Sequence, residues 1–232
     1  MELKYTVSGF IYISVEDDCH KVVDAMLETD YNEEFCIAEG FDPDFIARLM
    51  EAGFLVMSIN ISEDEPYYIL LPKLHLVRSV LHFDRLHIKR SIRRFLNNNL
   101  LNYELKADSD FDLIIDGCVE KHGADWLTPP LVEAIKKIRN DKNYCAYPTS
   151  FALYRDGNFV AGEFGVICGK VYTSYSGFYE EANAGTVQII LLTRYLKEKG
   201  FSFFDFGMPL DYKNSLGAEE ITPHEFVRLF RG

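Results

Sequence analysis

The last third of the chain alternates turn residues with apolar runs, and this pattern restricts the fold more than any other segment does. The run 151–155 leads through Asp156-Gly157, a dipeptide typical of two-residue hairpins, into a second run at 158–168. Gly169 marks another turn before a third run at 171–176. These features predict three consecutive antiparallel strands that form a meander.

A long apolar helix is predicted directly after the meander, over about residues 184–199, because Lys-Glu-Lys-Gly200 ends it as a helix terminus should. The strand 201–206 follows at once, so it can pair with the meander. A meander, a helix and a strand that returns to the meander form the core of the acetyltransferase-like (GNAT-like) fold. The sequence therefore predicts an α+β protein with an acetyltransferase-like C-terminal domain.

The N-terminal part alternates strands and helices of its own. The run 10–15 alternates like a strand, and Asp42-Pro43 opens a helix, since Asp can cap and Pro suits the first turn. We expect a small α/β lobe over residues 1–70 and the acetyltransferase-like domain over residues 71–232. Residues 140–149 are a candidate hinge.

Composition and cysteine use indicate a cytoplasmic protein. Of the 232 residues, 48% are apolar and 26% are charged, and no apolar run approaches the ~20 residues that a membrane helix needs. The N-terminus lacks the pattern of a signal peptide. The five cysteines are scattered without a CxxC pair, which favours reduced thiols. We find no zinc-site spacing and no glycine-rich phosphate loop in the sequence.

Charge is distributed unevenly along this chain, whose net charge is −12. Residues 1–66 hold sixteen acidic and three basic side chains, whereas residues 73–94 hold seven basic side chains and one acidic. A short positive segment in an acidic protein indicates an anion site, because the rest of the surface repels a polyanion. The alternative is that these cations pair with the acidic N-terminal segment. The candidate nucleic-acid-binding residues are those at helical spacing: Lys89, Arg90, Arg93 and Arg94.

Several distinctive segments follow one another along the chain: EFCIAEGFDPDFIARLMEAGF at 34–54, RSVL at 78–81, HIKRSIRR at 87–94, DWLTPPLVEAI at 125–135, DGNFVAGEFGV at 156–166, FFD at 203–205 and SLGAEEI at 215–221. Their order and spacing resemble those of the leucyl/phenylalanyl-tRNA–protein transferases, over about residues 30–230. That family carries, for example, D-G-x-L-V-G-G-x-Y-G-V and S-L-G-A-x-E-I in the corresponding places.

The resemblance implies a specific activity. Members of the family move leucine or phenylalanine from a charged tRNA to the α-amino group of a protein N-terminus, which marks the protein for degradation by the N-end rule. The implied partners are the 3′ acceptor end of an aminoacyl-tRNA and the N-terminus of an acceptor protein. No metal, small cofactor or membrane is implied. Because the aminoacyl ester is already activated, such an enzyme must position both substrates and stabilise the tetrahedral oxyanion.

Three departures from the family pattern concern chemistry. Tyr175 stands where the family has a Glu, and Thr186 where it has a Lys. The family segment Asp-Cys-Gln, whose Asp and Gln are proposed to relay the proton of the amine, becomes Asp205-Phe206-Gly207. The resemblance thus implies a preserved scaffold with an altered active site.

Candidate site residues follow from the resemblance, and each has a structural alternative. Asp205 is the candidate catalytic residue, unless it only caps the turn after its strand. Trp126, the single tryptophan, is a candidate stacking surface for the terminal adenine, or a core residue. Asn183 is a candidate substrate-binding residue, or only a helix N-cap. Four more residues are candidates for an aminoacyl pocket, or fill the core beneath the sheet: Phe164, Tyr175, Ser176 and Phe178.

We therefore expect an aminoacyl-tRNA–protein transferase of the Leu/Phe class. One alternative is a catalytically inactive homologue that binds tRNA ends or N-terminal peptides. Another is an enzyme that transfers an acyl group from acyl-CoA. The sequence disfavours the latter, because Glu180 and Glu181 precede the helix at 184–199 and would repel a pyrophosphate.

Overall fold

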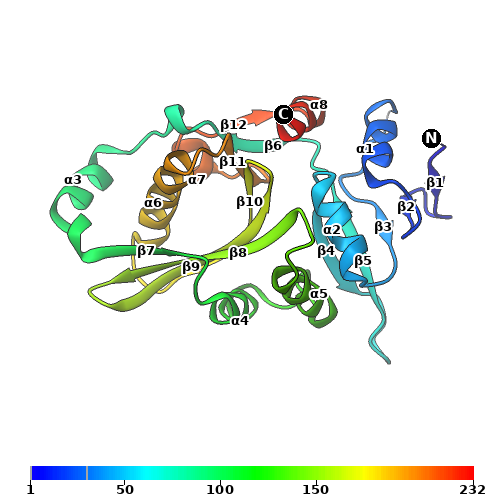
Figure 1. Cartoon of the computed structure of the whole chain (residues 1–232), viewed down its shortest axis with the longest axis horizontal. Coiled ribbons are helices and arrows are strands. Elements are labelled where there is room, and N and C mark those ends of the chain that lie inside the picture. The colour runs from blue at the N-terminus through cyan, green and yellow to red at the C-terminus, as the bar shows by residue number, and fades with distance from the viewer. Residues whose placement is uncertain (1, 30) are drawn as a thin grey trace. The chain divides into compact units, whose positions relative to one another are not determined.

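The computed structural model describes residues 2–29 and 31–232, which form two compact units (Figure 1). Unit 1 contains the chain up to Val77 together with Gly123–Tyr147 and Ile221–Gly232. Unit 2 contains Arg78–His122 and Pro148–Glu220. Three segments of the domain expected at 71–232 therefore belong to unit 1 instead: residues 71–77, 123–147 and 221–232. None of the helices in the described residues is long and apolar enough to cross a membrane.

Unit 1 is built on a five-stranded sheet in the order β1-β2-β3-β5-β4. The strands are β1 (Lys4–Tyr5), β2 (Ile11–Ile13), β3 (Ile37–Ala38), β4 (Leu55–Asn60) and β5 (Tyr68–Lys73). Its helices are α1 (Cys19–Leu27), α2 (Pro43–Glu51), α5 (Pro129–Asn140) and α8 (Pro223–Arg231). The predicted start of α2 is confirmed, because the carboxylate of Asp42 accepts a hydrogen bond from the Phe45 backbone N–H.

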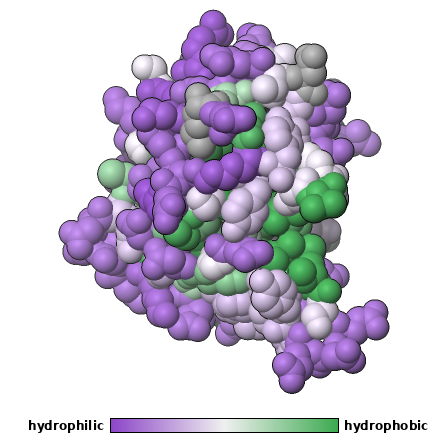
Figure 2. All heavy atoms as spheres, turned by 90° about the vertical axis from the view of Figure 1, so that its right-hand side faces the viewer, coloured by the Kyte–Doolittle hydropathy of each residue, from purple (hydrophilic) through white to green (hydrophobic). Residues whose placement is uncertain are grey.

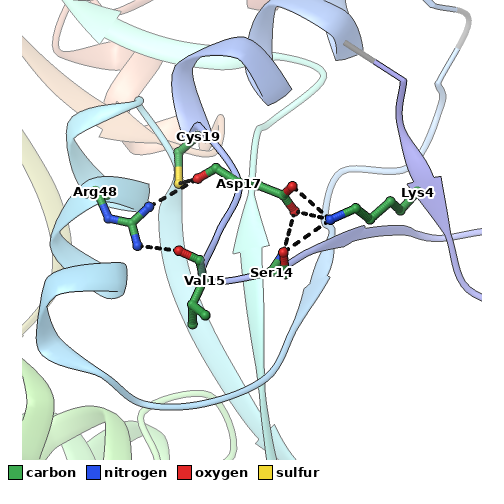
Figure 3. Close-up of polar contacts among 6 residues, drawn as sticks. All are labelled: Lys4, Ser14, Val15, Asp17, Cys19 and Arg48. Atoms are coloured by element: carbon green, nitrogen blue, oxygen red, sulfur yellow. Dashed lines mark hydrogen bonds and ion pairs between the residues drawn. The ribbon is translucent and has the colours of Figure 1, made fainter.

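Acidic side chains of the N-terminal segment pair with cations of unit 1. The Lys4 ammonium lies 2.8 Å from the Asp17 carboxylate, which also accepts hydrogen bonds from Ser14 (Figure 3). Arg48 donates to the carbonyl oxygens of Val15 and Asp17 (Figure 3). Farther along the chain, Glu34 pairs with Lys73. The face of the molecule shown in Figure 2 is mainly hydrophilic, with hydrophobic side chains gathered in a few places.

Unit 2 carries a seven-stranded sheet in the order β12-β6-β11-β10-β9-β8-β7. Its strands are β6 (Arg78–Leu81), β7 (Tyr103–Ala107), β8 (Ala146–Arg155), β9 (Asn158–Cys168), β10 (Val171–Tyr179), β11 (Phe203–Gly207) and β12 (Glu219–Ile221); β8 begins and β12 ends in unit 1. The predicted hairpin between β8 and β9 is confirmed, since Asp156 and Gly157 both have positive φ angles, as a type I′ turn requires.

The helix α6 (Ala184–Glu198) connects β10 to β11, and these two strands pair in parallel. A meander, a helix and a strand parallel to the last meander strand are the acetyltransferase-like α+β core that the sequence predicts. Val187, Ile190 and Leu192 of α6 pack on one face of the sheet, where Tyr172 and Phe204 are fully buried. The helix α4 (Phe111–His122) covers the other face, which carries Phe164, Ser176 and Phe178 (Figure 1).

The segment 215–218 packs against Arg85 and His87, within the basic region at residues 73–94. It follows α7 (Asp211–Ser215), and Gly217 has a φ of +95°. A Cβ atom at this position would lie only 2.1 Å from the carbonyl oxygen of Arg85. The backbone N–H of His87 donates to the carbonyl of Leu216 at 2.8 Å. His87 lies between the short 3-10 helix Phe83–Arg85 and the helix α3 (Arg90–Asn99). A second 3-10 helix, Leu100–Asn102, follows α3.

Candidate functional site

An irregularity in β10 marks the centre of the candidate site. Ser174 lies opposite Gly165 of β9, but the next paired residue is Ser176, which lies opposite Phe164. Tyr175 is therefore the extra residue of a β-bulge. Bulges bend a strand and redirect its side chains, and they are frequent beside active sites. Ser174, Tyr175 and Ser176 are all half-buried, so this part of the sheet is partly open.

The four residues predicted for an aminoacyl pocket gather on the α4 face of the sheet. Phe164 and Ser176 are cross-strand neighbours, and the ring of Tyr175 lies 5.9 Å from that of Phe164 between centroids. The ring of Phe178 lies 5.7 Å from that of Phe159 between centroids. Phe164 is fully buried and contacts Phe111 of α4, so it packs in the core as well as beside the bulge.

Asp205 lies in the middle of β11 and is completely buried, with its carboxylate bound by four hydrogen bonds. The Arg78 guanidinium donates two of them, from Nε to Oδ1 at 2.9 Å and from Nη2 to Oδ2 at 2.6 Å. The Thr173 hydroxyl donates to Oδ2 at 2.8 Å, and the Gly207 N–H donates to Oδ1 at 2.9 Å. An ionised carboxylate offers about four acceptor positions, so none is left over for a substrate.

This geometry bears on whether Asp205 acts as a general base or as a residue that positions its neighbours. A general base must reach the proton that it removes, with an acceptor lone pair available. Asp205 instead joins three neighbouring strands, because Arg78 belongs to β6 and Thr173 to β10. The arrangement favours a positioning residue, while direct catalysis by Asp205 stays a prediction.

A buried carboxyl group on the opposite face of the sheet is not among the predicted site residues. Glu163 of β9 is 7% exposed, and its Oε1 accepts a hydrogen bond from the Tyr172 hydroxyl at 3.2 Å. Desolvation raises the pKa of Glu163 to about 7, against the hydrogen bonds from Ser174 and Tyr172, which lower it. The position of an acidic residue inside an otherwise apolar strand, Val160–Val166, was the only available sign.

A second buried ionisable group lies near Glu163. The Lys213 ammonium, on α7, donates to the carbonyl oxygens of Phe206 at 2.6 Å and Met208 at 3.0 Å. Burial lowers the pKa of Lys213 to about 8, although the charges of Glu163 and Asp205 act in the other direction. Lys213 thus holds the turn that follows β11, and its charge interacts with both buried carboxyl groups.

The two remaining predicted substrate residues lie elsewhere. Asn183 occupies the N-cap position of α6 with a φ of +70°, but its side chain makes no capping hydrogen bond. This end of α6 lies beside the end of β10, since a Cβ at Gly185 would be 3.0 Å from the Tyr179 ring. Trp126 belongs to unit 1, where it is half-buried and its carbonyl oxygen accepts a hydrogen bond from the Ser58 N–H.

The basic region divides into paired and unpaired cations. Among the cations at 73–94, Arg78 pairs with Asp205 and Arg85 pairs with Glu219, while the single acid of this segment, Asp84, pairs with Lys197 of α6. By contrast, four cations at the start of α3 are exposed and take part in no ion pair with any described residue: Lys89, Arg90, Arg93 and Arg94. These four cations belong to unit 2 and the acidic N-terminal segment to unit 1, so their pairing with that segment stays a prediction.

Comparison with known proteins adds an independent observation. A protein from Maridesulfovibrio salexigens called leucyl/phenylalanyl-tRNA–protein transferase is 32% identical over 155 residues, which cover 65% of this chain and 62% of that protein. A protein of the same name from Hahella chejuensis is 28% identical over 86% of this chain and 82% of its own length. The chain thus matches less than two thirds of the first relative's length.

The solved structure of FemX aligns with 95% of this chain and 80% of its own, at 11% identity and a TM-score of 0.46. This likeness is too distant to inform function. Residues 80–231 match the profile of the family described as leucyl/phenylalanyl-tRNA protein transferase. This matched segment is well over half of the chain and includes β10, β11 and the basic helix. The chain therefore belongs to the leucyl/phenylalanyl-tRNA–protein transferase family.

Proposed function

We propose that this protein transfers an amino acid from a charged tRNA to the α-amino group of a protein N-terminus, in the cytoplasm, and thereby takes part in N-end-rule degradation. Membership of the family supports the reaction class. The observation that carries the proposal is the set of four exposed, unpaired cations on α3 in a chain of net charge −12. Such a surface attracts the phosphates of a tRNA acceptor end, whereas the remainder of an acidic chain repels them.

The reaction needs positioning more than bond activation. The α-amine attacks the ester carbonyl of the aminoacyl-tRNA, the tetrahedral oxyanion collapses, and the tRNA 3′ end leaves. Holding the two reactants in line replaces a bimolecular encounter, and hydrogen-bond donors must stabilise the oxyanion. In this proposal Phe164, Tyr175 and Phe178 contact the aminoacyl group, and Ser176 and Asn183 bind polar parts of the substrates. Trp126 stacks on the terminal adenine.

Asp205 acts in this proposal through the residues that it holds. Its carboxylate fixes the Arg78 side chain and the Gly207 N–H at the end of β11, where the chain turns toward Lys213. Loss of the carboxylate would leave a buried guanidinium without its counter-ion. The contribution of Asp205 to the rate is then indirect, through the shape of the site.

The saturated carboxylate of Asp205 also favours a second candidate function. With no acceptor position left on its predicted base, the protein would be a homologue that binds tRNA ends or N-terminal peptides without turnover. The two candidates differ in whether a peptide bond forms.

One experiment separates them. A bulk tRNA pool is charged with labelled amino acids and incubated with the protein and with peptides that differ only at residue one. Label that enters peptides with a free N-terminus, but not acetylated peptides, supports the transferase. Retention of tRNA or peptide on the protein without transfer to any acceptor overturns it and supports the binding protein.

A further inference from the structure

The carboxyl group of Glu163 is buried and forms no ion pair with a cation of the described residues. It is 7% exposed, and no Lys, Arg or His nitrogen of the described residues lies within ion-pair distance of it. Lys213, whose charge acts on Glu163, directs hydrogen bonds to two carbonyl oxygens instead. A buried carboxylate is costly unless a cation or several donors compensate it, so such a group is a candidate binding site.

Neutral hydroxyl groups hold this carboxyl group in place. The Tyr172 hydroxyl donates to Oε1 at 3.2 Å, and Ser174 also forms a hydrogen bond to the carboxyl group. Both donors lie on β10, directly before the bulge at Tyr175. An ionised carboxylate has about four acceptor positions, so two hydroxyl donors orient it and leave acceptor capacity for a ligand.

The strand position opposite Glu163 carries no side chain. Gly177 of β10 is the cross-strand neighbour of Glu163, and it is exposed although Glu163 is buried. A Cβ atom on Gly177 would lie 3.2 Å from the Glu163 Cβ and 2.9 Å from the carbonyl oxygen of Gly162. Any larger residue would therefore crowd the strand at the point where a ligand could approach the carboxyl group.

The titratable neighbours of Glu163 come from three elements. Tyr172 lies on β10, Tyr212 and Lys213 lie on α7, and Cys118 lies on α4. Burial raises the pKa of Cys118 and Tyr212 to about 12, and raises that of Tyr172 as well. Of Glu163 and these neighbours, only Glu163, with a pKa of about 7, and Lys213, with a pKa of about 8, change charge around neutral pH.

We propose that Glu163 is a specificity-determining residue whose carboxylate, oriented by Tyr172 and Ser174, binds an ammonium or guanidinium group of a substrate beside the bulge in β10. The identity of the substrates rests on the proposed function. The cationic group then has two possible sources, the side chain or α-amine of the acceptor N-terminal residue, or the side chain of the transferred amino acid. Both sources offer the same chemistry to a carboxylate, namely a charge-assisted hydrogen bond.

The test compares the parent protein with Glu163→Gln, which keeps the size of the side chain and removes its charge. Glu104→Gln serves as the matched control, because Glu104 lies on the same sheet, in β7, and is exposed. In the acceptor arm, one aminoacyl-tRNA is offered with peptides that start with Lys, Arg, Leu or Phe. In the donor arm, tRNAs charged with Lys, Arg, Leu or Phe are offered with one peptide.

We expect Glu163→Gln to lower kcat/KM for the cationic substrates of one arm by about 10- to 100-fold, with less than a threefold change for the apolar substrates. Glu104→Gln should behave like the parent. The arm in which the loss occurs identifies the source of the cation. Unchanged discrimination in both arms overturns the proposal, as does an equal loss for cationic and apolar substrates.

Equilibrium binding keeps the inference testable if the parent shows no turnover. The probes are a Lys-initiated peptide, a Leu-initiated peptide and the lysyl and leucyl amides of 3′-amino-3′-deoxyadenosine, titrated from pH 5.5 to 7.5. Protonation of Glu163 below about pH 7 should weaken the binding of the cationic probe to the parent, whereas Glu163→Gln should bind it weakly at every pH. Absence of turnover then overturns the proposed function alone. Equal affinity of parent and variant for every probe overturns the role of Glu163.

Discussion

The Arg78 guanidinium and the Asp205 carboxylate form a bidentate ion pair in the interior of unit 2, at 2.9 Å and 2.6 Å, with neither residue more than 1% exposed. The two residues are 127 positions apart in the sequence. Because Thr173 donates to the same carboxylate, this ion pair connects β6, β11 and β10 at the edge of the candidate site.

Asp205→Asn should destabilise the protein strongly. The substitution leaves the Arg78 charge buried without its counter-ion, which costs about 3–5 kcal/mol in the free energy of unfolding, or roughly 10 °C in Tm. Thermal and urea denaturation followed by circular dichroism measure the change. Asp211→Asn, at an exposed position on α7, is the control and should leave Tm within about 2 °C of the parent.

The double variant Arg78→Met/Asp205→Leu tests the reason for that loss. Removing both charges should recover much of the stability, because the uncompensated charge, rather than the missing hydrogen bonds, dominates the cost. If Asp205→Asn folds with the stability of the parent while kcat falls about 10²- to 10⁴-fold, Asp205 acts directly as a base and the positioning role is wrong.

The exposed cations of α3 should contribute to tRNA binding through phosphate contacts. Each of Arg90→Ala and Arg93→Ala should reduce the steepness of log affinity against log salt concentration by about 0.7–0.9, since one counterion-releasing contact is lost. Filter binding of charged tRNA across a series of salt concentrations measures this slope. Lys137→Ala removes a cation that is paired with Glu133, and it should leave the slope unchanged. A slope unaffected by both arginine variants would make the α3 surface structural.

Stability should fall with rising pH because of Glu163. Its pKa in the folded protein is about 7 against 4.5 for an ordinary Glu, so the folded state binds more protons than the unfolded state between these values. The free energy of unfolding therefore decreases as pH rises from about 4.5 to 7. Glu163→Gln should remove this decrease and be more stable than the parent at pH 8 by about 2–3 kcal/mol. Parallel pH profiles of parent and variant would contradict a buried, desolvated Glu163.

Gly217 should tolerate alanine far less than Gly169 does. Both glycines have positive φ angles, but a Cβ at Gly169 meets nothing within 4 Å, whereas at Gly217 it would lie 2.1 Å from the Arg85 carbonyl oxygen. Gly169→Ala should cost about 1 kcal/mol for backbone strain alone. Gly217→Ala should cost at least about 3 kcal/mol, because the backbone at Arg85 must move. Urea denaturation of the two variants measures the difference, and equal losses would exclude the steric contact as its cause.

Local sequence signals, namely turn residues and helix ends, determined most of the C-terminal fold. Turn residues such as Asp156-Gly157, and Gly200 just after the C-cap of α6, act through local φ and ψ angles, so the meander and the following helix were predictable. The helices α1 and α8 were not predicted, although Asp18 and Thr222 cap them. The division into units was not predictable either, because residues 123–147 and 221–232 join unit 1 through packing between distant segments.

The sequence alone also placed the candidate site in β9, β10 and β11, because the motifs that indicate the family lie in these strands. Only the tertiary structure decided the environment of each group in that site. Sequence spacing does not show that Asp205 is saturated by Arg78, Thr173 and Gly207. Nor does it show that Glu163 is buried with no cation of residues 2–29 or 31–232 within ion-pair distance. Charge, pKa and access depend on desolvation and on partners brought together by strand pairing, and these are properties of the folded chain.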